Sequence, residues 1–204
     1  MQSTIKLNLN VEENTKKDLI DISENLKGRI NWALTQPPKP SSIDGNIKDQ
    51  RKKAAAAERE WGNKMIGQTD NGQWTTKLGE GLVYDVLEVL DKNPRKVECM
   101  KGLQPDWETD THMYEVKTSS WHVAGTAGEK VLGTFIKYQD IPKIYGKPLR
   151  IVCVAFQEHE LQYGKTKYFG EEVTDKTKQL LDIAKTWGIE YIRFSDLIEG
   201  LNYK

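Results

Sequence analysis

Two carboxylates and a lysine stand close together near the middle of this chain. Glu115 and Lys117 are separated by one residue, so on a β-strand both side chains project from the same face. Asp106 precedes Glu115 by eight intervening residues, the length of a tight hairpin return. We therefore expect Asp106 at the end of the neighbouring strand, beside Glu115 and Lys117.

These residue types suit metal-assisted hydrolysis. Two adjacent carboxylates repel each other unless a divalent cation neutralises them. Mg²⁺ prefers one or two carboxylates and keeps several of its waters, which matches Asp106 and Glu115. A metal held there lowers the pKa of a bound water and stabilises charge on phosphorus. Lys117 would orient or activate that water and offset charge on the phosphate.

A Glu-x-Lys triplet alone is usually an ordinary ion pair on a surface hairpin. Three features favour a catalytic interpretation here: Pro105 precedes Asp106, the apolar Val116 stands inside the triplet, and a helix carrying Glu80 comes upstream. Glu80 shares a helical face with apolar residues, so it could face the sheet and the metal. It could equally be an acid favoured near a helix start by the helix dipole.

The periodicity of apolar residues predicts the elements that position these side chains. Helices are expected at 11–34, 47–66, 76–91 and 174–187, and strands at 95–101, 111–118, 149–156 and 189–194. The apolar run 149–156 is uninterrupted, which indicates a central strand buried on both faces. Helices followed by a strand pair and then strand–helix–strand predict an α/β (α+β) domain with one mixed sheet. The proline-rich stretch 36–42 predicts a linker.

The pattern Pro105-Asp106 … Glu115-Val116-Lys117, in this order of elements, resembles the PD-(D/E)XK nuclease superfamily. The resemblance covers about Trp74 to Phe194, and the segment after Lys117 is similar to type II restriction endonucleases. It implies a mixed-sheet core flanked by helices. It also implies Mg²⁺, replaceable by Mn²⁺, with Asp106, Glu115 and Val116 as metal residues and Asp106, Glu115, Lys117 and Glu80 as catalytic residues.

A type II restriction endonuclease cuts double-stranded DNA, usually at palindromic sites, so the resemblance implies a homodimer with one active site for each strand. It further implies a cognate DNA methyltransferase encoded nearby. We expect a nuclease core at 71–204 and a helical N-terminal region at 1–70 that contacts DNA or forms the dimer. Two alternatives stay open: a structure-specific resolvase or repair nuclease of the same superfamily, and a DNA-binding domain without catalysis.

The long segment 119–148, rich in glycine and lysine, is the expected DNA contact after the catalytic strand. The candidate DNA-binding residues are Thr118, Ser119, Ser120, Trp121, His122, Lys130 and Lys137. Trp121 could instead pack in the core, and the lysines could belong to a solvated face. The basic stretch 51–53 presents the same choice between a phosphate clamp and a solvated helix face.

Composition leaves DNA binding open. The chain has 30 basic and 30 acidic residues, so its net charge is zero. A local basic groove beside an acidic metal site would also give a net charge near zero. The three histidines lack the spacing of paired metal ligands. Cys99 and Cys153 are expected to be buried free thiols in a reducing cytosol. Without a signal-peptide pattern or an apolar stretch of membrane-spanning length, we expect a cytoplasmic protein.

Overall fold

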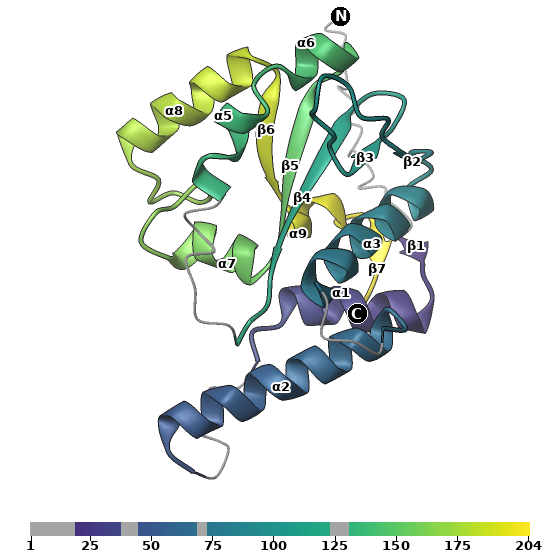
Figure 1. Cartoon of the computed structure of the whole chain (residues 1–204), viewed down its shortest axis with the longest axis vertical. Coiled ribbons are helices and arrows are strands. Elements are labelled where there is room, and N and C mark those ends of the chain that lie inside the picture. The colour runs from purple at the N-terminus through teal and green to yellow at the C-terminus, as the bar shows by residue number, and fades with distance from the viewer. Residues whose placement is uncertain (1–18, 38–44, 69–72, 123–130) are drawn as a thin grey trace, which may run out of the picture.

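Strand β5 (Leu149–Ala155) is buried along almost its whole length, as its unbroken apolar sequence predicts. It lies between β4 (Met113–Ser119) and β6 (Ile189–Arg193), and both strands pair with it in parallel. Beyond β4, the short strands β3 (Trp107–Glu108) and β2 (Arg95–Lys96) run antiparallel. The five strands form one mixed sheet in the order β2-β3-β4-β5-β6 (Figure 1).

The computed structural model describes residues 19–37, 45–68, 73–122 and 131–204. The helices are α1 (Glu24–Leu34), α2 (Ile47–Met65), α3 (Trp74–Val89), α5 (Thr134–Lys137), α6 (Ile141–Tyr145), α7 (Phe156–Tyr163), α8 (Asp175–Thr186) and α9 (Phe194–Leu197). A separate pair, β1 (Ile20–Asp21) and β7 (Leu201–Asn202), is parallel. The expected class, a mixed sheet flanked by helices, is confirmed. Within the described ranges, no helix has both the length and the apolar character needed to cross a membrane.

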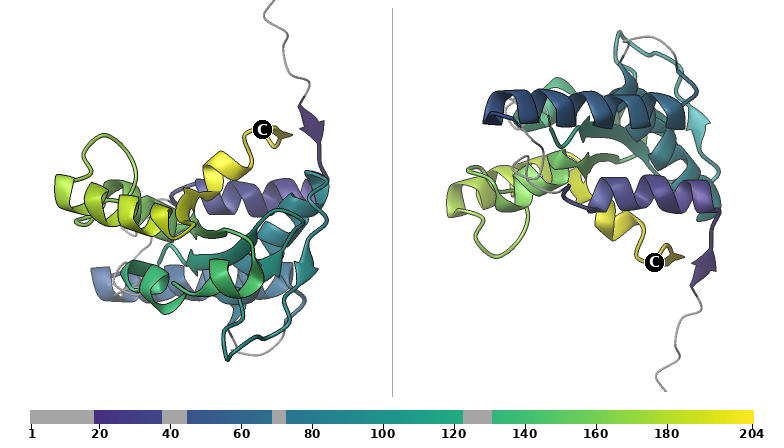
Figure 2. Two further views of the ribbon diagram at one scale, coloured as in Figure 1. Left: turned by 90° about the horizontal axis from the view of Figure 1, so that it is seen from above. Right: turned by 90° about the horizontal axis from the view of Figure 1, so that it is seen from below.

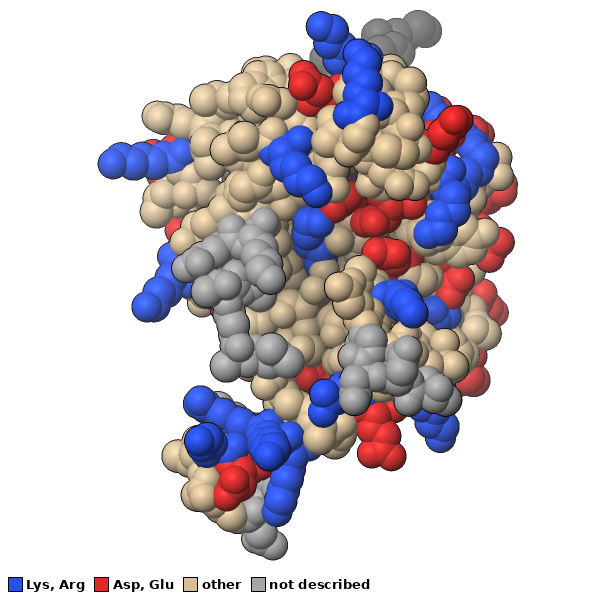
Figure 3. Space-filling view, viewed as in Figure 1, with Lys and Arg blue, Asp and Glu red and all other residues tan. Residues whose placement is uncertain are grey.

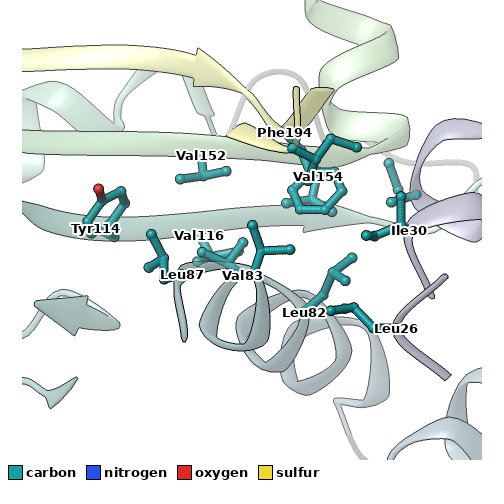
Figure 4. Packing of buried hydrophobic residues seen from close by; sticks show 14 of the residues in the cluster. Leu26, Ile30, Leu82, Val83, Leu87, Tyr114, Val116, Val152, Val154 and Phe194 are labelled. Carbon is teal, nitrogen blue, oxygen red and sulfur yellow. The ribbon is translucent and has the colours of Figure 1, made fainter. Parts of the chain in front are cut away.

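Each face of the sheet packs against its own hydrophobic cluster, and helices lie on both sides of it (Figure 2). Alternate side chains of β4 divide between the two, with Tyr114 and Val116 in the first cluster and Met113 in the second. Helices α1, α3 and α9 contribute to the first cluster, and α5, α6 and α8 to the second. Figure 4 shows Val83 and Leu87 of α3 directed at β4.

The first helix begins later than expected. Residues 19–23 are not helical, because Ser23 caps α1 by accepting a hydrogen bond from the Leu26 N–H (3.3 Å) and β1 pairs with β7 just before it. Residues 11–18 of the expected helix lie outside the described part of the chain. The apolar face of α1 packs into the first cluster, so the two regions divided at residue 70 share one hydrophobic cluster.

The segment expected as an open loop, 119–148, is largely folded where it is described. It contains α5 and α6, and Phe135, Tyr138 and Ile141 are buried in the second cluster. Phe135 on α5, Tyr138 at its C-cap and Ile141 at the start of α6 all point into this cluster, and their burial outweighs the local glycines. Residues 123–130 lie outside the described ranges.

Two further expectations are wrong, and a third differs from the structure by one residue. The strand expected at 95–101 is only β2, and the chain turns away from the sheet at Lys101 and Gly102, which both have positive φ. Cys99 is therefore exposed, whereas Cys153 in β5 is buried as expected. The strand expected at 149–156 ends at Ala155, whose φ of 56° turns the chain directly into α7.

Candidate active site

The hairpin of β3 and β4 brings the two predicted carboxylates together. Trp107 pairs with Tyr114, so Asp106, just before β3, lies alongside the middle of β4. The Asp106 carboxylate accepts a hydrogen bond from the Val116 N–H, with 2.6 Å between Oδ2 and N. This bond, made beyond the last β3–β4 pair, holds Asp106 next to Glu115.

Glu115 is the most buried charged side chain of the site, with 4% of its surface exposed. Its Oε1 pairs with the Lys117 ammonium on the same face of β4, while Oε2 is buried without a hydrogen-bond partner. Burial, and then the negative Asp106, raise the pKa of Glu115 to about 7 against the opposing effects of Lys117 and the Tyr138 hydroxyl. A buried carboxylate oxygen without a partner is a natural ligand position for a cation.

Glu80 on α3 reaches the same place. Its carboxyl group is a hydrogen-bond neighbour of Asp106. Burial and the charge of Asp106 raise the pKa of Glu80, while Lys96 and Lys117 act in the opposite direction. The pKa of Asp106 is raised as well, chiefly by burial. Of the two interpretations of Glu80, the geometry favours the one in which it faces the sheet.

Helix α3 approaches β4 unusually closely beside this carboxyl cluster. A Cβ atom on Gly79 would lie 1.7 Å from the Thr118 Oγ1, so only glycine fits there. The Trp107 indole donates a hydrogen bond to the backbone carbonyl of Glu80 (3.0 Å). These two contacts hold the start of α3 against the hairpin, and thereby place Glu80.

Two members of the site were missed from the sequence. Lys96 on β2 lies with its ammonium 4.0 Å from the centre of the Trp107 ring, and its charge acts on both Glu80 and Asp106. Tyr138, which ends α5, lies beside Glu115 and receives a hydrogen bond from Lys137 Nζ (3.0 Å). Neither residue stands at a motif spacing, so only the packing of β2 and α5 identifies them.

The donor set suits a small hard cation held through few protein ligands. Among the residues that the structure describes, no group of three or more His, Cys, Asp or Glu side chains forms a ready metal cluster. Asp106 and the free Oε2 of Glu115 nevertheless fit Mg²⁺, which takes one or two carboxylates and keeps waters. In a β-strand, the N–H and C=O groups of one residue point to the same side. Because the Val116 N–H points to Asp106, the Val116 carbonyl points to that side of β4 too. Glu80 adds a further carboxyl next to Asp106.

The predicted DNA-contact residues after β4 are held mainly by the protein itself. Ser120 is buried, and the Thr118 hydroxyl oxygen is buried against Gly79. The N–H groups of Trp121 and His122 both donate to the Glu58 carboxylate of α2 (2.8 and 3.0 Å). Their packing favours the structural interpretation of this stretch.

The Trp121 indole donates to the Trp32 carbonyl (2.8 Å), so its side chain packs against the first cluster, as the core interpretation expected. Ser119, at the end of β4, is half-buried. Lys137 is exposed beside the site through its bond to Tyr138. Lys130 lies outside the described residues.

Basic side chains gather away from the carboxyls. Figure 3 shows acidic groups with neighbouring lysines in the middle of this face, and a group of Lys and Arg over the outer end of α2, which extends from the body. Arg51 and Lys52 in that helix are exposed, and its buried positions face inward through Ala54 and Glu58. The chain as a whole has equal numbers of acidic and basic residues, but they are separated into an acidic centre and a basic helix α2.

No protein-family model, curated protein or solved structure matches this chain.

Proposed function

We propose that this protein is a Mg²⁺-dependent endonuclease that hydrolyses phosphodiester bonds in double-stranded DNA. The observation that carries the proposal is the position of Asp106, which lies at hydrogen-bond distance from Glu80 and acts electrostatically on the buried Glu115 beside Lys117. Structural ion pairs do not require carboxyls placed next to one another, because their repulsion destabilises the fold unless a cation or proton compensates.

In the proposed reaction, each residue has a separate task. Asp106, Glu115 and the Val116 carbonyl would hold the cation, which would supply Lewis-acid activation of a water and stabilise negative charge on the phosphate oxygens. Lys117 orients the attacking water and offsets charge on the phosphate. Its pairing with Glu115 keeps the ammonium on the same strand face as the ligand oxygens.

A nucleic acid is the substrate class that the surrounding charges favour, and the motif resemblance favours DNA. Lys96, Lys117 and Lys137 border the acidic centre, and lysines neutralise the phosphates of a nucleic-acid backbone. The basic α2 provides a further surface for backbone phosphates. These contacts give binding without sequence information, so the finer proposal of a type II restriction enzyme rests on the motif resemblance.

Cutting both strands of a symmetric site requires two active sites, and we propose a homodimer. The N-terminal helices are less suitable for the contact than expected, because the apolar face of α1 is already buried. Helix α8 instead exposes Leu180 and Ile183, and Trp187 at its C-cap is exposed on the same side. Exposed apolar residues that lie together are typical of an interface centre, and we propose that the second copy binds there.

Incubation with phage DNA tests the function. With Mg²⁺ we expect discrete fragments, and with excess EDTA none, while Ca²⁺ should support binding with little cleavage. Lys117→Ala should lower the cleavage rate by about 10²–10³-fold. Lys143→Ala, a lysine exposed on α6, serves as the matched control and should keep the wild-type rate. A smear of products would favour the nonspecific or structure-specific alternative, and full activity in EDTA would exclude the metal mechanism.

A further inference from the structure

A second concave site lies at the carboxyl ends of the three parallel strands. This pocket, of about 310 Å³, is lined by Trp121 after β4, Ala155 at the end of β5 and Arg193 at the end of β6. Figure 1 shows α7, α9 and α1 gathered at this end of the sheet.

The walls of the pocket are aromatic. The rings of Trp121 and His159 lie with centroids 5.7 Å apart, and those of His159 and Tyr163 with centroids 5.0 Å apart. Tyr163 is 64% exposed, so an aromatic face remains open to solvent at the mouth. Aromatic faces of this kind stack planar rings.

The floor of the pocket offers hydrogen-bond acceptors. Glu158 is 8% exposed, and its two oxygens accept hydrogen bonds from the Ser195 hydroxyl (2.6 Å) and N–H (3.1 Å). Each carboxylate oxygen has two lone-pair sites, so each can accept one further N–H donor. The His159 Nδ1 is buried without a partner. Arg193 stands at the rim, where it pairs with Asp196.

The backbone is distorted to build this floor. Ala155 has φ 56° and ψ −129°, a conformation that an alanine adopts only under strain. The turn at Ala155 sends the chain from β5 into α7 and brings Glu158 and His159 over the strand ends. Strained residues of this kind concentrate at ligand sites.

We propose that this pocket receives one nucleobase displaced from its stack, with guanine preferred. The proposal rests on the proposed function for its DNA, but the pocket chemistry is separate from the cleavage site. Guanine presents two adjacent N–H donors on its Watson–Crick edge, and each Glu158 oxygen keeps one lone-pair site beyond the one that Ser195 uses. Adenine, cytosine and thymine present a single donor group beside an acceptor.

The pocket lies within reach of a strand bound at the active site. Trp121 is four residues beyond Lys117, which limits the separation of their Cα atoms to about 14 Å. Bases of one strand rise about 3.4 Å per step, so we expect the accepted base within a few steps of the cleaved phosphate. A base in a pocket must leave the stack, which enzymes that extrude nucleotides achieve with aromatic and hydrogen-bonding contacts.

The first measurement needs no DNA. Calorimetric titration of the full chain with GMP, AMP, CMP and UMP should give a Kd for GMP at least about tenfold lower than for the other three. Tyr163→Ala should weaken GMP binding, whereas Tyr163→Phe, which keeps the ring, should not. Glu158→Gln should abolish the preference for guanine. Because Glu158 also caps α9, circular dichroism must show that the Glu158→Gln variant is folded. If that variant is unfolded, the comparison of Tyr163→Ala with Tyr163→Phe tests the site instead, since Tyr163 is exposed.

The second measurement uses duplexes with 2-aminopurine beside each base in turn, within five steps of the scissile phosphate and in Ca²⁺ to prevent cleavage. We expect fluorescence to rise several-fold at one position, and Tyr163→Ala to remove the rise while duplex binding persists. Duplex binding without any rise, together with no GMP binding, would overturn the pocket proposal and leave the nuclease proposal intact. GMP binding without duplex binding or cleavage would overturn the nuclease proposal alone.

Discussion

Two glycines on α3 should respond in opposite ways to the same substitution. A Cβ on Gly79 would lie 1.7, 2.6 and 2.9 Å from three atoms of Thr118, whereas a Cβ on Gly81 meets nothing within 4 Å. Both positions are helical, so alanine at either lowers the conformational entropy lost on folding. We expect Gly81→Ala to raise the free energy of unfolding by about 1 kcal/mol.

At Gly79, alanine brings the same favourable entropy change, but its Cβ atom would overlap with Thr118. Rotation of the Thr118 side chain does not relieve the contact, because the Thr118 Cβ itself would stand 2.6 Å away. Helix α3 must therefore move away from β4. Overpacking of this kind costs about 1–3 kcal/mol, which leaves Gly79→Ala between neutral and about 2 kcal/mol less stable than the wild type. The movement also carries Glu80 away from Asp106, and displacement by about 1 Å can lower a rate about 10²-fold.

Urea unfolding and DNA cleavage measured on both variants test this reasoning. Gly81→Ala should keep the wild-type cleavage rate, and Gly79→Ala should lower it strongly even at temperatures where it is fully folded. The double variant with Thr118→Gly removes the colliding atoms and should recover part of the loss. Equal stability and equal cleavage for the two single variants would refute the close approach of α3 as the device that positions Glu80.

Three other predictions concern charge and assembly. The pKa of Glu115 is about 7 in the folded protein against an ordinary value of 4.5, so the folded state binds more protons than the unfolded state between these pH values, and stability falls as pH rises through this window. The free energy of unfolding that the wild type loses across this pH window is at most about 3 kcal/mol. In EDTA, Glu115→Gln should therefore unfold at a higher urea concentration than the wild type at pH 8, and at a similar concentration at pH 4.5. Lys137→Ala should reduce the slope of log K against log salt by about 0.9 if this lysine contacts a phosphate, while leaving the cleaved sequence unchanged; an unchanged slope would remove it from the interface. Light scattering should give a mass near twice 23.4 kDa for the wild type and a monomer for Ile183→Glu, and a dimer in both would exclude α8 as the contact.

The sequence predicted the parts of the site that depend on local periodicity. The period of two along β4 puts Glu115 and Lys117 on one face, and a hairpin brings Asp106 to their side. The continuous apolar run of β5 likewise required burial on both faces. These relations are local, so tertiary packing had little freedom to change them.

The parts that were missed depend on long-range packing. Tyr138 stands 23 positions after Glu115, within a segment whose glycines suggested an open loop. Its burial follows from the fit of α5 and α6 against the second cluster, which no motif spacing records. Lys96 belongs to a strand of only two residues, whose place depends on pairing with β3. Cys99 was predicted to be buried because it stands in an apolar segment. It is exposed because the chain turns away at Lys101 and Gly102, which the apolar neighbours do not reveal.

The raised pKa values of the carboxyls and the proposed metal chemistry have one physical cause. Burial that excludes water from Glu80, Asp106 and Glu115 raises their pKa values, and the nearby lysines only partly reverse this effect. A proton at Glu115 therefore competes with any cation for Oε2, and cation affinity must rise with pH until that proton is lost near pH 7. The same burial strengthens the attraction between the carboxylates and a cation once it is bound, since the local dielectric is low. A site that is destabilising when empty and deprotonated is thus the one that gains most when Mg²⁺ replaces the proton.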